Sequence, residues 1–169
     1  VIAPTLSSST PADDATSVAI DSNIQLTFSE IVDVETGNIY IKKSADNSTF
    51  ETIDVTSSQV TGTGTTTITT NPTNNFDSGT QYYVQIDASA FDDPSGNSYA
   101  GISDTTSLSF TSADIGAPTL SSSSPADDAT SVAIDSNIEL TFSEIVDVKT
   151  GNIVIKKSSD NSIIETIDV

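Results

Sequence analysis

The sequence contains no Cys, His, Met or Trp, and its five basic residues are all Lys. Without Cys there can be no disulfide bond or thiolate chemistry, and without His the commonest general base and metal ligand is missing. Five Lys stand against 24 acidic residues, so the formal net charge is −19. This charge repels the phosphates of nucleic acids and anionic lipids. The apolar runs are only a few residues long, too short to cross a bilayer. We therefore expect neither nucleic-acid binding nor membrane insertion.

Small hydroxyl residues dominate what is present, with 28 Ser and 25 Thr among 169 residues. The chain begins at Val1 with neither an initiator Met nor a secretory signal, so we interpret it as an internal piece of a longer protein. Its low hydrophobicity and high charge would by themselves suggest disorder. The regular spacing of its Val, Ile, Phe and Tyr residues indicates a folded chain instead.

An internal repeat organises the chain. Residues 4–55 and 118–169 differ at only seven of 52 positions, which gives a period of about 114 residues. That period has the size of one β-sandwich domain. We expect a complete domain over residues 1–114 and, over residues 115–169, the first half of a second copy that lacks a counterpart of residues 56–113.

Within one period, short segments of alternating apolar and polar residues predict β-strands. Residues 23–29 place Ile24, Leu26 and Phe28 on one face, and residues 38–42 do the same with Ile39 and Ile41. Turn residues separate these segments, and no window has a helical period. The pattern predicts an antiparallel β-sandwich. The other expected strands lie near residues 5–8, 18–20, 50–56, 65–70, 81–87 and 107–111.

A turn that contains Gly79 leads directly into a strand that begins with two tyrosines, Tyr82 and Tyr83. A Tyr at this place is typical of a tyrosine corner, in which the phenol hydrogen-bonds back to the chain at a Greek-key crossover. Either residue could serve. We favour Tyr82 because it lies in the buried register with Val84 and Ile86.

Several motifs in order resemble the bacterial Ig-like domain family of the SbsA type, which occurs in S-layer proteins and large tandem-repeat adhesins. They read SSSPADDATSVAIDSNIELTFSEIVD and TGNIVIKK in the second copy, and DSGTQYYVQIDASAFDDPSGN and SLSFTS in the first. The resemblance covers residues 3–113 and 117–169. It implies an all-β, Ig-like Greek-key sandwich used in tandem at the bacterial surface, and it implies no catalytic activity.

Acidic residues concentrate in two segments that an Ig-like sandwich would place at the same end. The first contains Glu30 and Asp33, and the second contains Asp87, Asp92, Asp93 and Asn97. Crowded carboxylates repel one another unless a cation joins them, and Ca²⁺ accepts six to eight oxygen ligands. One interpretation is a calcium site here. The other is an ordinary turn in which Asp caps backbone amides, since Asp-Pro-Ser-Gly-Asn is a common turn sequence.

A second candidate calcium site lies at the junction between repeats, where Asp114 occupies the linker. We expect Asp13 and Asp14 at the same end of the first domain, and Glu144 and Asp147 at the facing end of the next. A shared calcium ion would stiffen the junction. Alternatively, Ala117-Pro118 limits bending and the acids are hydrated.

Two hypotheses for function remain. The first is a non-catalytic spacer of a large secreted or surface-anchored adhesin, stiffened by calcium, with neighbouring repeats as its partners and any glycan or protein ligand bound by other domains. The second is a carbohydrate-binding accessory domain of a secreted hydrolase. Sugars stack on exposed aromatic rings, and the candidates for such a strip are Tyr40, Tyr83 and Tyr99. Both hypotheses place the protein outside the cell or on its surface.

The two near-identical half-repeats compete for the single copy of residues 56–113. We expect residues 4–55 to win because their connection to it is direct. The remaining half would then expose an apolar face, which favours a strand-swapped dimer.

Overall fold

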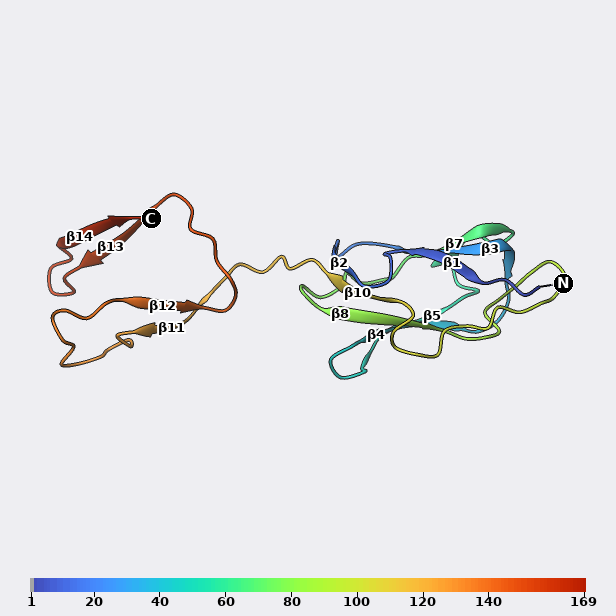
Figure 1. Ribbon diagram of the computed structural model, residues 1–169, viewed down its shortest axis with the longest axis horizontal. Helices are drawn as coiled ribbons and strands as arrows, with labels where there is room; N and C mark the ends of the chain where they lie inside the picture. Colours follow the sequence, from blue (N-terminus) through green and yellow to red (C-terminus); the bar gives the residue numbers. More distant parts are fainter. Residues whose placement is uncertain (1) are drawn as a thin grey trace. The chain divides into compact units, whose positions relative to one another are not determined.

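The computed structural model describes residues 2–169, which form two compact units, Val1–Gly116 and Ala117–Val169. Each described element is a β-strand (Figure 1). The first unit contains β1 (Leu6–Thr10), β2 (Ala15–Val18), β3 (Ile24–Val34), β4 (Asn38–Lys43), β5 (Thr49–Asp54), β6 (Val60–Thr61), β7 (Thr65–Thr70), β8 (Gln81–Ile86), β9 (Phe91–Asp92) and β10 (Ser109–Ser112). The second contains β11 (Leu120–Ser124), β12 (Glu139–Phe142), β13 (Asn152–Lys156) and β14 (Ile163–Asp168).

Two sheets make the sandwich of the first unit. One has the strand order β1-β3-β7-β6, with β9 added to β3, and the other has the order β2-β10-β8-β4-β5. Strands that are distant in sequence are therefore neighbours, as β3 is with β7 and β10 with β8, and the chain crosses between the sheets repeatedly. This arrangement confirms the predicted all-β Greek-key sandwich.

The core lies between the two sheets and consists of the residues that alternation placed inward. Ile24, Leu26 and Phe28 of β3 are buried, and so are Ile39 and Ile41 of β4. Residues 56–113 contribute to both sheets, and their buried side chains pack against residues 4–55 as expected. The buried residues of this segment are Ile68, Phe76, Tyr82, Val84, Ile86, Ala90, Phe91, Tyr99, Ile102, Leu108 and Phe110.

Tyr82 forms the predicted tyrosine corner. Its ring is fully buried, and its hydroxyl accepts a hydrogen bond of 2.9 Å from the backbone N–H of Asp77. The rings of Phe50, Phe76 and Phe110 surround it, with centroid separations between 4.9 and 5.7 Å. The corner therefore joins the turn before β8 to an aromatic cluster in the core.

We predict that Tyr82→Phe keeps the fold and lowers the free energy of unfolding by about 1 kcal/mol, with 2 kcal/mol as a rough upper bound. The ring packing survives this substitution, but the Asp77 amide loses its partner. Denaturant unfolding of the two proteins measures the difference. Tyr99→Phe is the matched control, because Tyr99 is also buried but no hydrogen bond to its hydroxyl is found among the described residues. Equal losses in both variants would contradict a special role for the corner.

Two features of the sandwich differ from the sequence-based expectation. The short strands β6 and β9 were not predicted, and residues 30–34, expected as a loop, continue β3 to Val34. This extension exists because β9 pairs with the end of β3, matching Asp33 with Asp92 and Val34 with Phe91. The pairing of β3 with β7 is irregular between Thr27 and Val32, where the other edge of β3 passes from β1 to β9.

The chain enters and leaves the first unit at opposite ends of the sandwich (Figure 1). At the entry, the Thr5 carbonyl accepts a hydrogen bond from the amide of Ser29, the middle residue of β3. At the exit, Ala113 bonds to Val18 and Gly79, near the turn where Phe76 donates to the Ile20 carbonyl. The exit thus lies beside the beginning of β3 and the entry lies farther along this strand.

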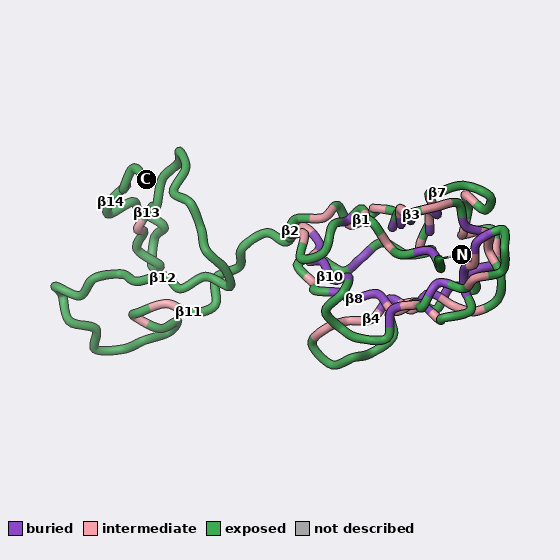
Figure 2. Tube along the Cα trace, turned by 45° about the vertical axis from the view of Figure 1, so that its right-hand side comes forward, coloured by how far each residue is buried: buried purple, intermediate pink, exposed green. Residues whose placement is uncertain are grey.

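The second unit consists of two separate hairpins, β11-β12 and β13-β14. Its strands are almost entirely green in Figure 2, whereas those of the first unit are largely purple and pink. Phe142 is 36% exposed, for example, although the same residue in the first copy, Phe28, is 3% exposed. The repeated sequence is therefore buried in only one of its two copies.

Candidate functional site

Two carboxylates face each other at the predicted acidic end of the first unit. Asp33 of β3 lies directly opposite Asp92 of β9, and both are partly buried. The hydroxyl of Thr63 lies 3.5 Å from the Asp33 carboxylate and accepts a hydrogen bond of 3.0 Å from the Val34 amide. Like charges directly opposite each other in a strand pair generally repel, and a cation or salt screens them. Sequence reasoning missed Thr63, although its place between Gly62 and Gly64 marks the tip of a hairpin.

Asp93, the neighbour of Asp92, holds the turn that follows β9. Its carboxylate accepts hydrogen bonds from the backbone amides of Ser95 and Asn97, at 2.8 and 2.9 Å, and from the side-chain amide of Asn97. The bonds from the Asn97 amide and side chain hold the pKa of Asp93 below its ordinary value. The Asp93 carboxylate thus already binds the donors of its own turn, as expected if Asp-Pro-Ser-Gly-Asn is an ordinary turn.

Asp87 forms its hydrogen bonds at a different place, the beginning of β4. One oxygen of its carboxylate lies 2.9 Å from the Asn38 amide and 3.3 Å from the Tyr40 hydroxyl, so it caps the beginning of β4. Glu30 is partly exposed within the extended β3. Across residues 2–169, no three acidic side chains gather closely enough to hold a metal ion. Of the six residues proposed for this end, the structure pairs Asp33 with Asp92 and Asp93 with Asn97, and it leaves Asp87 and Glu30 apart.

At the exit of the first unit, Asp114 is part of a local turn. Its carboxylate accepts hydrogen bonds of 2.9 Å from the Ser78 hydroxyl and from the Gly116 amide. Asp13 and Asp14, which were expected beside it, instead bind Ser109 at the beginning of β10. The four residues of β10 separate them from Asp114, so the hydrogen bonds of Asp13 and Asp14 do not involve it.

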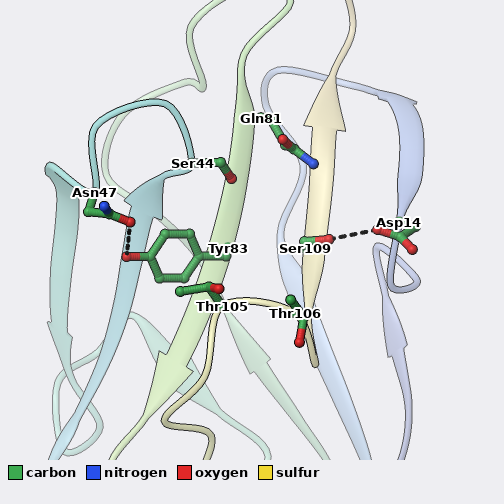
Figure 3. A pocket seen from close by; sticks show the side chains of 8 residues that line it. All are labelled: Asp14, Ser44, Asn47, Gln81, Tyr83, Thr105, Thr106 and Ser109. Atoms are coloured by element: carbon green, nitrogen blue, oxygen red, sulfur yellow. Dashed lines mark hydrogen bonds between the residues drawn. The ribbon is translucent and has the colours of Figure 1, made fainter.

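A shallow polar hollow of about 290 Å³ lies beside β8 and β10 (Figure 3). The Tyr83 hydroxyl donates to the side-chain oxygen of Asn47 at 3.1 Å, and the Ser109 hydroxyl lies 3.0 Å from the Asp14 carboxylate. The remaining lining residues are Ser44, Gln81, Thr105 and Thr106. This hollow presents hydroxyl, amide and carboxylate groups to solvent.

The hollow contains no aromatic surface on which a sugar could stack. Tyr83 is only 3% exposed and its hydroxyl is bound to Asn47, and Tyr99 is buried against Phe28 at 5.2 Å between ring centroids. Only Tyr40 of the three candidates is partly exposed. Tyr83 and Tyr99 are therefore excluded as candidates for an exposed aromatic strip.

Asp104 closes the loop next to this hollow. Hydrogen bonds from the Ser107 hydroxyl and from the amides of Thr106 and Ser107 lower the pKa of Asp104 from 3.8 to about 2. The carboxylate therefore stabilises the folded state fully above about pH 4, and that contribution is lost as the pH falls toward 2. Its partners identify it as a structural residue of the loop.

In the described part of the chain, residues 2–169, no helix has the length and apolar character needed to cross a membrane. Among solved structures, the chain is similar to CopC from Methylosinus trichosporium OB3b, with 13% identity and a TM-score of 0.46 over 68% of this chain and 97% of that one. It is also similar to the S-layer protein rSbsC(31-844), with 14% identity and a TM-score of 0.45 over 96% of this chain and 22% of that one. The N-terminal part of the S-layer protein SbsC gives 14% identity and a TM-score of 0.46, over 96% of this chain and 37% of that one.

No curated protein matches the sequence. The model of the bacterial Ig-like domain family matches residues 1–112 and again residues 114–169, which together are almost the whole chain. The match agrees with the two-sheet Greek-key topology, the tyrosine corner and the repeat. The chain belongs to the bacterial Ig-like domain family.

Proposed function

We propose that the chain is a non-catalytic spacer module of a secreted or surface-anchored bacterial repeat protein. The observation that carries this proposal is the position of the chain ends in the first unit, which lie at opposite ends of the sandwich. Repeats that are joined at opposite ends add their lengths along the strand direction. The strongly acidic surface suits this role, since like charge keeps a long array soluble.

The side chains favour this function over an enzyme or a lectin. Asp87, Asp93 and Asp104 accept hydrogen bonds from neighbouring donors, as residues that hold loops do. The polar hollow beside β8 is shallow, and Tyr83 offers no ring face to a sugar. These side chains therefore serve to hold the sandwich together, which is what a spacer needs.

Small-angle X-ray scattering of arrays that contain one, two and four copies of residues 1–114 tests this role. We expect the maximum dimension to grow by a constant increment of about 35–45 Å for each added repeat, since β3 has eleven residues at about 3.3 Å each. Arrays that grow as compact clusters, with increments that shrink at each step, would contradict the spacer function.

Calcium binding is part of the proposal and concerns the facing carboxylates of Asp33 and Asp92. A cation there would relieve their repulsion. With free calcium at about ten times its Kd, we expect a stabilisation of about 1.4 kcal/mol, which raises the Tm of the first unit by several degrees. Differential scanning calorimetry in calcium and in chelator measures it.

Asp92→Asn serves as the variant and Asp104→Asn as the control, because Asp104 lies in a different loop. Calcium should raise the Tm of the control as it does that of the original chain, but it should leave Asp92→Asn unchanged. Identical curves in calcium and chelator for the original chain would exclude the calcium site and leave the spacer function intact.

A further inference from the structure

A second hollow, of about 240 Å³, lies where β8 ends. Its apolar lining consists of the side chains of Ile86 and Ile102, which are almost fully buried, and the methyl groups of Ala88 and Ala100. The partly exposed ring of Tyr40, on the neighbouring strand β4, lines it as well. The hollow therefore joins one aromatic ring to a small apolar surface, which is how sites for small ligands are commonly built.

Asp87 brings a carboxylate of fixed orientation to this hollow. Its Oδ2 atom accepts a hydrogen bond of 2.9 Å from the Asn38 amide, and the Tyr40 hydroxyl donates to the same atom at 3.3 Å. Across residues 2–169, no hydrogen bond to its Oδ1 atom is found. An ionised carboxylate only accepts hydrogen bonds, and it has room for several. One oxygen thus holds the group in place while the other remains available to a donor from outside.

Gln85 lines the same hollow and contributes a second acceptor. Its side-chain amide donates to the Ser103 carbonyl at 2.6 Å and lies 3.5 Å from the Asp104 carbonyl. Both partners are acceptors, so the nitrogen faces them and the side-chain oxygen is left over. No hydrogen bond to that oxygen is found in the described part of the chain. A molecule bound here must therefore supply hydrogen-bond donors.

The charges around the hollow favour a neutral ligand. Asp87 repels anions. The ammonium of Lys42 lies 5.9 Å from the centroid of the Tyr40 ring, so a positive charge already interacts with this ring and would repel a second cation. A sugar ring is neutral and carries several hydroxyl donors. Its C–H groups bear a small positive charge, which the negative face of an aromatic ring attracts.

The walls of the hollow are held by hydrogen bonds within the sandwich. Ile86 and Ile102 exchange two backbone hydrogen bonds of 2.9 Å. Gly101, with φ of +77°, allows the turn that brings residues 100–103 against the end of β8. The bond from Gln85 to Ser103 fixes the same segment. A site that is formed in advance costs little ordering when a ligand binds.

We propose that the hollow beside Tyr40 binds a single neutral sugar ring. The C–H face of the sugar packs on Tyr40, and its neighbouring hydroxyls donate to Asp87 and to the side-chain oxygen of Gln85. Pockets for drug-sized ligands measure about 300–1,000 Å³, so this smaller hollow fits one ring, and we expect a Kd of about 1–10 mM. Such weak binding is additional to the spacer role and does not depend on it.

The test is an NMR titration of the isotopically labelled full chain with the methyl glycosides of glucose, galactose, mannose and N-acetylglucosamine. With at least one of them, we expect amide shifts confined to residues 38–42, 85–88 and 100–103, and saturation transfer from the protein to the C–H protons of the sugar. Butylammonium chloride, the cationic probe, should leave these amides unchanged. The proposal is overturned if no glycoside shifts these amides, if butylammonium shifts them more strongly, or if the shifts lie around residues 44–47 and 105–109 instead.

Two variants of Tyr40 test the contribution of its ring. Tyr40→Val introduces the residue that the second copy carries as Val154, and a β-branched residue suits a strand. It should weaken binding of the glycoside by about tenfold or more, because the stacking surface is lost. Tyr40→Phe keeps the ring and loses only the bond to Asp87, so it should bind within about threefold of the original chain. Unchanged binding by Tyr40→Val would contradict the proposal.

Asp87→Asn tests the carboxylate. The substitution leaves one oxygen for the Asn38 amide but replaces the free acceptor with a donor, and it should weaken binding by about tenfold or more. Asp54→Asn is the matched control, because it removes the same charge from the neighbouring strand β5, where the carboxylate binds Thr56 and does not line the hollow. The control should bind as the original chain does. Equal affinities of the two Asp variants would overturn the proposal.

Discussion

Phe28→Ala should lower the Tm of the main unfolding transition by at least about 10 °C. The Phe28 ring is 3% exposed and packs at 5.4 Å from the ring of Phe91 and at 5.2 Å from that of Tyr99. Truncating a buried Phe to Ala typically costs about 3–5 kcal/mol, because the cavity closes only in part. A domain of this size loses about 4 °C or more for each kcal/mol. Differential scanning calorimetry measures the shift.

The chain provides a matched control for this substitution within itself. Phe142 occupies the same position in the second copy, in the same local sequence and in the same hairpin register. Its ring is 36% exposed, and no aromatic contact to it is found among residues 2–169. Phe142→Ala should therefore shift the main transition by less than about 2 °C. Similar shifts in the two variants would show that the second copy contributes to the same core.

The comparison of the two copies also shows which parts of the fold depend on local sequence. Asp14 and Asp128 adopt nearly the same positive φ, 58° in each, and Asn47 and Asn161 adopt 59° and 60°. The two hairpins keep their registers in both units. Turn residues and strand alternation specify these features without help from a core, which is why they could be predicted from the sequence.

Other elements depend on a partner that is distant in sequence. Residues 15–18 form β2 only because β10 lies beside them, and the same sequence at residues 129–132 is not a strand. In the same way β3 has eleven residues where β12 has four, since β7 and β9 extend the first and have no counterpart beside the second. Alternation within a segment carries no information about such partners, so the length of β3 and the presence of β9 could not be predicted.

The same distinction between local sequence and distant partners applies to the candidate site. The sequence predicted that the segments around Asp33 and Asp92 lie at the same end, because the order of strands in the sandwich places them there. It could not predict how Asp93 and Asp87 find their donors, since these are backbone amides whose positions depend on the folded loops. Tyr83 was expected to be exposed by alternation, but it is 3% exposed and its hydroxyl donates a hydrogen bond to Asn47, between β4 and β5. Contacts with residues outside a strand leave no periodic signal in that strand.

Gly101→Ala should destabilise the first unit by about 2–5 kcal/mol, although it adds a single methyl group. Gly101 has φ of +77°, which costs an L-residue about 1–2 kcal/mol. A Cβ atom here would overlap the Ile86 carbonyl oxygen and lie 2.8 Å from the Ala88 nitrogen. Both are backbone atoms that cannot rotate away. The next residue, Ile102, exchanges two hydrogen bonds of 2.9 Å with Ile86, so relieving the overlap would break this bridge and expose Ile102.

Gly96→Ala separates the cost of the backbone angle from the cost of the overlap. Gly96 has φ of +79°, almost the same as Gly101, but a Cβ atom there would meet no other atom within 4 Å. It should therefore cost only the 1–2 kcal/mol of the backbone conformation. Overpacking accounts for the remainder at Gly101, typically about 1–3 kcal/mol. Denaturant unfolding should place Gly101→Ala below Gly96→Ala in stability by at least about 1 kcal/mol. Equal losses would mean that the end of β8 moves freely away from residue 101, and the bridge between Ile86 and Ile102 would then contribute little to the sandwich.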